Sequence, residues 1–277
     1  MLRDLAEVWR FRALLWQLVR RDLKVRYKNS RLGILWSIAP PLMEVAVITY
    51  AMKRATVYAA DFPSYSAFVL VAMIPWTYFQ TAILDSSQSI VQMYGVIRKV
   101  YLPREIIPLA SAISNFIHFL LSWAVFFIYW WGLSRGPVLW TALLFPYFAV
   151  VQFMLVTGIS LFVSCLNVFY EDVKYILTIL MRVGLFLMPI MYLVEQVKGR
   201  GQHGDLLYQI YRFTPLSALI TGYRRALLES PSLKVLNGPY LPLDWVSLGL
   251  AGLVSAAVLV GGYAFFNARK WQFVERP

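Results

Sequence analysis

Six stretches of the chain are apolar enough and long enough to cross a lipid bilayer as helices. Four of them contain no Asp, Glu, Lys or Arg, whereas the first contains only Glu44 and the fifth only Arg182. About 20 residues at a rise of 1.5 Å each cover the roughly 30 Å hydrocarbon core, and the runs lack the alternation of a membrane β-strand. The pattern therefore predicts an all-α polytopic membrane protein with six transmembrane helices, at about residues 32–52, 62–84, 106–131, 138–166, 175–194 and 245–268.

The segments between these runs are too short to fold as soluble domains, so residues 1–277 are predicted to form one transmembrane domain. Within the cytoplasmic segment 1–31, charged and apolar residues recur at steps of three and four, which predicts an amphipathic helix lying at the membrane surface. The last apolar run carries small residues at close to four-residue spacing, which favours tight helix packing.

The connection 195–244 contains apolar pieces at 206–211 and 215–228 that are too short to span a bilayer. We expect them to form re-entrant or interfacial helices on the outer side. Their basic and aromatic residues would line the outer mouth of a path, namely Tyr211, Arg212, Tyr223, Arg224 and Arg225.

The charge distribution indicates a topology rather than a nucleic-acid partner. Only 14% of the residues are charged, compared with about 25% in soluble domains. The net charge is +12, and nine of the 26 Lys and Arg residues fall within the first 31 positions. Because short loops rich in Lys and Arg stay cytoplasmic, both termini and the connection 85–105 are predicted to be cytoplasmic.

The chain offers little catalytic equipment. It has two histidines, His118 inside a predicted span and His203 in the outer connection, and a single cysteine, Cys165. No G-x-x-x-x-G-K-[ST] sequence occurs, so a nucleotide would have to be bound by another chain. We expect no catalytic, cofactor-binding or metal site here.

Two charges and several aromatic side chains lie deep in the predicted spans. A charge near the bilayer centre costs from about 2.5 kcal/mol upward, so Glu44 and Arg182 should face protein or a watered cavity, either paired with each other or lining a path. Aromatic residues form interfacial belts or, where they face inward, stack on sugars. The candidates for channel or substrate contact are Glu44, Trp76, Tyr78, Phe79, Arg182 and Tyr192.

Several short motifs resemble those of the ABC-2 type permeases that export polysaccharides such as O-antigen, teichoic acid and capsule chains. The run Arg21–Lys28 followed by Leu35-Trp36-Ser37 is similar to the entry of their first span. The likeness continues through Ile74-Pro75-Trp76, through the specific stretch Lys99–Leu109, and through Leu166-Asn167-Val168. It covers most of the chain.

The resemblance implies a homodimeric permease in the inner membrane of a bacterium, with a channel between the two copies. Each copy would bind a separate ABC ATPase that holds ATP and Mg²⁺, and the pair would move a lipid-linked polysaccharide outward. The residues implied to contact the ATPase are Arg98, Lys99, Tyr101, Pro103, Arg104 and Glu105. Those implied to lie at the cytoplasmic gate are Arg21, Lys24, Arg26 and Tyr27.

Two other functions remain open at this point. A secondary transporter driven by protons or sodium would show inverted repeats and several intramembrane ionisable residues. A membrane-embedded glycosyl or acyl transferase would need acids, or a nucleophile and a base, converging at one interface. A copurifying ATPase would favour the exporter, whereas turnover of a lipid donor by the isolated chain would favour the transferase.

Overall fold

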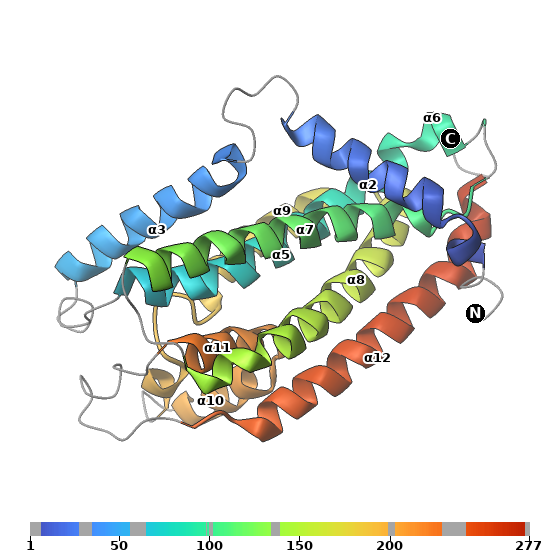
Figure 1. The fold of residues 1–277 in the computed structure, drawn as a ribbon. Coiled ribbons are helices and arrows are strands. Elements are labelled where there is room, and N and C mark those ends of the chain that lie inside the picture. Colours follow the sequence, from blue (N-terminus) through green and yellow to red (C-terminus); the bar gives the residue numbers. More distant parts are fainter. Residues whose placement is uncertain are drawn as a thin grey trace.

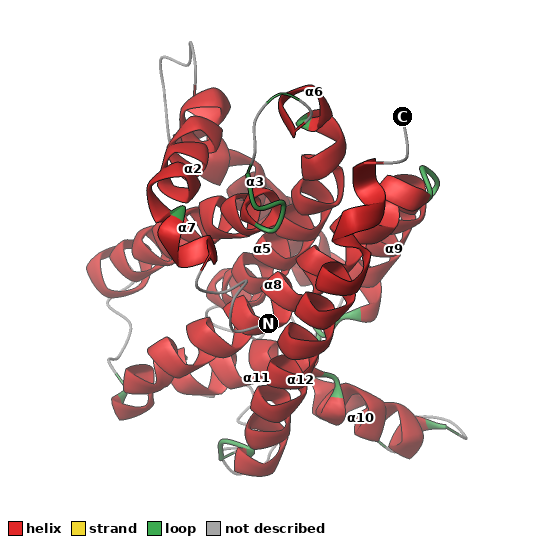
Figure 2. Ribbon diagram, turned by 90° about the vertical axis from the view of Figure 1, so that its right-hand side faces the viewer, coloured by secondary structure: helices red, strands yellow, loops and turns green. Residues whose placement is uncertain are grey.

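The protein is a bundle of helices. The computed structural model describes residues 7–27, 35–55, 65–97, 99, 102–133, 139–198, 203–228 and 242–274. Figures 1 and 2 show only helices and connecting loops in these ranges, without any strand. The predicted all-α class is therefore confirmed for the part of the chain that the structure describes.

Four helical segments are long and apolar enough to cross a membrane: Tyr65–Gln92, Ile106–Gly132, Trp140–Phe169 and Trp245–Phe273. The first is α5 (Tyr65–Gln92). The second joins α7 (Ile106–Phe127) to the π-helical turn η1 (Ile128–Leu133), and the third joins η2 (Trp140–Leu144) to α8 (Phe145–Phe169). The fourth joins α12 (Trp245–Arg269) to η5 (Lys270–Val274). Four of the six predicted spans thus coincide with helices that are long and apolar enough to cross a membrane.

The other two predicted spans are helical but are not among these four. Residues 32–52 coincide with α3 (Leu35–Ala55), and residues 175–194 coincide with α9 (Val173–Leu187). The 15 residues of α9 reach only about 22 Å, less than the core of roughly 30 Å. The helix ends because Met188 is extended, with ψ of 148°, as a residue before a proline prefers. That α3 and α9 each cross the bilayer therefore remains a prediction.

The remaining helices are short or lie at the ends of the bundle. They are α2 (Arg12–Tyr27), α6 (Tyr94–Ile97), η3 (Val194–Val197), α10 (Gly204–Phe213) and α11 (Pro215–Leu227). Helix α10 begins within the predicted outer connection, and Thr214 separates it from α11. The two apolar pieces of that connection are therefore helical, as expected.

Helix α5 lies at the centre of the bundle, in contact with α3, α7, α8, α9 and α11. It continues past residue 84, where the predicted span ends, to Gln92. Pro75 lies inside it, and the buried Gln152 of α8 donates to the Pro75 carbonyl at 2.7 Å. Trp76 packs so closely on α9 that a Cβ at Gly184 would lie 2.6 Å from its indole ring.

The small residues of the last span pack against α8. A Cβ on Gly158 of α8 would lie 2.5 Å from the Val258 carbonyl oxygen of α12, and a Cβ on Gly262 would overlap the Gly158 carbonyl. Two helices approach this closely only where side chains are absent. The tight packing expected from the small-residue pattern is confirmed.

A smaller apolar cluster lies at one end of the bundle. It brings together the N-terminal helix, the start of α7 and the end of α12, through buried residues such as Val19, Ile106 and Phe266. Figure 1 shows α2, α6 and the end of α12 at one end of the bundle, and α10 and α11 at the other. The first and last helices thus meet at one end, and its assignment to the cytoplasm is a prediction.

Candidate functional site beneath α2

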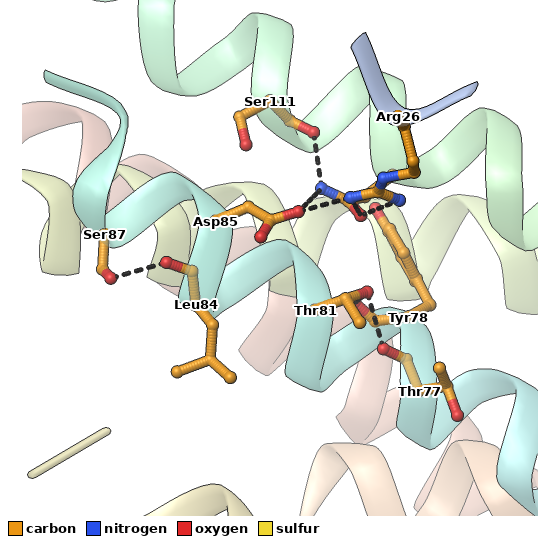
Figure 3. A network of polar contacts seen from close by, with 9 residues as sticks. Arg26, Thr77, Tyr78, Thr81, Leu84, Asp85, Ser87 and Ser111 are labelled. Atoms are coloured by element: carbon orange, nitrogen blue, oxygen red, sulfur yellow. Dashed lines mark hydrogen bonds and ion pairs between the residues drawn. The ribbon is translucent and has the colours of Figure 1, made fainter. Parts of the chain in front are cut away.

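A polar network joins the end of α2 to the bundle (Figure 3). Arg26 donates from Nη2 to Asp85 Oδ2 of α5 at 2.6 Å, and from Nη1 and Nη2 to Asn115 Oδ1 of α7 at 3.2 and 3.1 Å. Asn115 Nδ2 in turn donates to Asp85 Oδ2 and to the Ser111 carbonyl, both at 3.0 Å. Three helices therefore meet in one hydrogen-bonded cluster.

The contacts of this network contribute a modest free energy to the packing of α2 against α5 and α7. The side chains of Arg26 and Asp85 are 34% and 44% exposed, so solvent screens their ion pair, which contributes about 0.5–1 kcal/mol. Asn115 is buried, and leaving its amide without partners would cost about 1–3 kcal/mol. The contact is strong enough to position α2 and weak enough to open during a conformational change.

The other predicted gate residues lie on the same helix. Arg21 forms an ion pair with Asp22 at 2.7 Å and donates from Nη1 to Met93 Sδ at 3.3 Å. Lys24 is exposed. Tyr27 is the last residue of α2, and its side chain lies outside the described part of the structure. That these residues gate a path stays a prediction.

Two cavities meet at Arg26. The larger, of about 440 Å³, lies between α2, α5 and α7. The smaller, of about 80 Å³, continues between α3, α5 and α7 and also has Arg26 and Asn115 in its lining. The uncharged polar residues of the larger cavity are Gln88, Ser89, Gln92, Ser111, Ser114 and Asn115. Those of the smaller one include Thr77, Tyr78, Thr81, His118 and Ser122.

Asp85 is absent from the predicted site because the second span was expected to end at residue 84, and Asn115 is absent because it lies among the apolar residues of the third predicted span. A signal for Asp85 exists in the sequence. Thr81, Asp85, Gln88 and Gln92 recur at steps of three and four residues, which is the spacing of one helix face. That spacing indicates that α5 continues with a polar face, as the structure shows.

The predicted ATPase-coupling segment is described in part. Arg98 and Tyr101 lie outside the described residues, Lys99 is exposed and Pro103 is buried. Arg104 lies over the Phe273 ring, 5.7 Å from its centroid, and donates to the Lys270 carbonyl. Burial lowers the pKa of Arg104, while Tyr94 and Glu105 act in the opposite direction.

Glu105, another of the predicted coupling residues, is buried. Lys270 Nζ donates to Glu105 Oε1 at 2.5 Å, and the two side chains are 9% and 2% exposed. This ion pair joins the segment before α7 to the end of α12. In this structure Glu105 is therefore an internal partner of Lys270 instead of a surface group.

The predicted channel residues do not converge on one site in the single chain. Glu44 of α3 and Arg182 of α9 are both exposed, and no ion pair joins these two described side chains. Trp76 is buried in the core, and Tyr78 is buried at the edge of the smaller cavity. The two remaining candidates, Phe79 and Tyr192, are half-buried.

Three of the predicted outer-mouth residues, Tyr211, Arg212 and Arg225, line one small pocket between α10, α11 and the start of α12. Arg212 donates from Nε to Asp244 Oδ2 at 2.6 Å, and Asp244 caps α12 by accepting from Ser247 N at 3.2 Å. Hydrogen bonds from Arg212 and Ser247 hold the pKa of the Asp244 carboxyl well below its usual range. Arg225 pairs with Glu195, and both line the same small pocket.

Arg224 and Tyr223 of α11 are buried. The Arg224 guanidinium donates to the carbonyls of Phe68, Pro189, Ile190 and Tyr192 and lies 3.6 Å from the centroid of the Phe68 ring. Tyr223 lies within the aromatic cluster of the core. Arg224 thus satisfies the backbone that becomes irregular after α9.

Known proteins resemble this chain over nearly its whole length. A model of the ABC-2 type transporter family matches residues 13–228. The chain is 25% identical over 275 residues to the O-antigen export system permease protein RfbA of Myxococcus xanthus, which covers 99% of both chains. It is 27% and 28% identical to two O-antigen export system permease proteins RfbA of Klebsiella pneumoniae, over 95% of this chain and 94% of each relative.

Proposed function

This chain belongs to the ABC-2 type transporter family, and we propose that it is the membrane permease of an ATP-driven exporter of a lipid-linked polysaccharide. The observation that carries the proposal is the end-to-end similarity to permeases whose names specify O-antigen export. The substrate class inferred from it is an O-antigen-like, teichoic acid or capsule chain, moved outward across the inner membrane of a bacterium.

The energy for export comes from a separate chain. The permease sequence has no phosphate-binding loop of the common NTPase type, so ATP and Mg²⁺ bind to partner ABC ATPase subunits. Each ATPase docks on the segment 98–105, and its nucleotide state biases the permease between inward-closed and outward-open conformations. The buried pair of Glu105 and Lys270 links this segment to the last span.

Two copies of the permease enclose the path. In each copy α3 and α9 act as the first and fifth spans, so that each copy has six transmembrane spans. Six helices cannot both surround a sugar-wide path and shield it from lipid, so a second copy is needed. Helix α9 supports this arrangement because one of its faces is apolar and exposed in the single chain, including Ile176, Ile179, Val183 and Phe186.

The arrangement of the ends fits a multi-pass protein with both termini in the cytoplasm. The basic N-terminal helix and the last helix meet at one end of the bundle. The positive-inside rule assigns that end to the cytoplasm. The outer end then carries α10 and α11, where Tyr211, Arg212 and Arg225 would stand at the exit.

A deletion in the native host tests the proposal. Cells lacking the gene should lose the surface glycan and accumulate lipid-linked glycan inside, and the intact gene should restore export. The tagged permease should copurify with an ABC ATPase and a second copy of itself. Normal surface glycan in the deletion strain, or a purified chain that transfers sugars by itself, would contradict the proposal.

A further inference from the structure

The cavity beneath α2 has the chemistry of a binding site for an uncharged sugar chain. Figure 3 shows Arg26 of α2 and Asp85 of α5 meeting there, beside Ser111 of α7, whose backbone carbonyl accepts a hydrogen bond in the same network. We propose that this cavity, within one copy of the chain, binds a short uncharged segment of glycan. The inference rests on the proposed export of a polysaccharide and adds a site for it.

The lining supplies hydrogen bonds of the kind that sugar hydroxyls need. Amide side chains come from Gln88 and Gln92 of α5, and hydroxyl groups come from Ser111 and Ser114 of α7. Amides and hydroxyls both donate and accept, as sugar hydroxyls do. The volume of about 440 Å³ lies within the usual range of small-molecule sites, about 300–1,000 Å³.

The charges of the lining favour a neutral ligand over an anionic one. The cavity has two arginines and two aspartates in its lining, and they pair with each other. Arg21 binds Asp22 at 2.7 Å, and Arg26 binds Asp85 at 2.6 Å. A phosphate or an acidic lipid headgroup would have to displace a carboxylate from each arginine, whereas a neutral hydroxyl can add to the pairs without breaking them.

The two cavities form successive parts of one polar face. Along α5 the face runs from Gln92 through Asp85 and Thr81 to Thr77, and Arg26 with Asn115 stands between the larger and the smaller space. Polar side chains that line a continuous space between membrane helices are typical of a path for a polar substrate. Movement of α2 that separates Arg26 from Asn115 would join the two spaces.

Crosslinking in the native host tests the site. The photoreactive residue p-benzoylphenylalanine replaces Gln88 or Gln92, whose exposed side chains make no described hydrogen bond. It replaces Val91 in the matched control, which is exposed on α5 but does not line the cavity. We expect a ladder of glycan adducts from both glutamine positions and none from Val91.

A second variant measures the contribution of the amides. Gln88→Ala with Gln92→Ala should lower the export rate at limiting substrate about tenfold, the effect of losing two ordinary hydrogen bonds. The control Gln80→Ala, on the same helix but outside both linings, should export at the wild-type rate.

The outcomes separate this inference from the proposed function. Adducts with phospholipid or with another protein, or equal glycan adducts from Val91, would overturn the glycan site while export by the chain still stands. Unchanged export by the double alanine variant would do the same. Surface glycan in cells that lack the chain altogether would overturn both.

Discussion

Breaking the ion pair between Lys270 and Glu105 should destabilise the protein more than any other single change in a charged side chain near this end of the bundle. Nζ and Oε1 are 2.5 Å apart, and the side chains are 9% and 2% exposed. Glu105→Leu removes the buried carboxylate to which Lys270 Nζ donates, and breaking a buried ion pair in this way costs about 3–5 kcal/mol. Lys270→Met breaks the same ion pair, at a similar cost.

Replacing both residues removes the buried charges together. The double variant Glu105→Leu/Lys270→Met should therefore lose about 1 kcal/mol or less, because two apolar side chains of similar volume replace the pair. The free energy of unfolding, measured in mixed detergent micelles for the four proteins of the cycle, gives the coupling directly. Lys99 is exposed, so Lys99→Met serves as the control and should change the free energy of unfolding by less than about 0.5 kcal/mol. Single variants that each cost under about 1 kcal/mol, or a double variant that costs their sum, would refute this reasoning.

Three further predictions use the same unfolding assay. Gly262→Ala should cost about 1–3 kcal/mol because its Cβ would overlap the backbone of α8, whereas Gly261→Ala, with open space around it, should be neutral; equal effects would contradict the packing. Arg224→Met should cost about 3–5 kcal/mol because several buried carbonyls lose their donor, and Arg224→Lys should recover only part of that cost; a neutral Arg224→Met would exclude the proposed role in the backbone after α9. The pKa of Asp244 is lower in the folded protein than in the unfolded chain, where an aspartate has a pKa of about 3.9. The ion pair with Arg212 therefore stabilises the fold fully above about pH 3.9, and this stabilisation is lost as the pH falls from there through the folded-state pKa. The free energy of unfolding should fall by about 1 kcal/mol below about pH 4, and Asp244→Asn should abolish this part of its acid dependence. If the free energy of unfolding of the variant depends on pH as that of the wild type does, other groups cause the dependence.

Much of the fold follows from the hydrophobic pattern. Four charge-free runs became four candidate spans, because continuous apolar sequence can be satisfied in a membrane only as helix. The boundaries were less predictable. Asp85 lies on a helix that continues to Gln92, and its charge alone gives no indication of the Asn115 amide and Arg26 guanidinium that accommodate it.

The candidate site was predictable only in part. The basic residues of α2 were expected to act together, and Arg26 does lie in a network. Its partners come from positions 59 and 89 residues away in the chain, and no local spacing encodes such contacts. Glu105 was inferred to face an ATPase by resemblance, but its burial against Lys270 depends on how α12 ends beside the start of α7.

Transport by purified components tests the central claim most directly. The permease would be reconstituted into vesicles with a lipid-linked glycan, either alone or with the partner ATPase, and glycan movement and ATP hydrolysis would be followed together. We predict movement and substrate-stimulated hydrolysis only when both proteins and ATP are present. Hydrolysis by the permease alone, or glycan movement without the ATPase, would contradict the account.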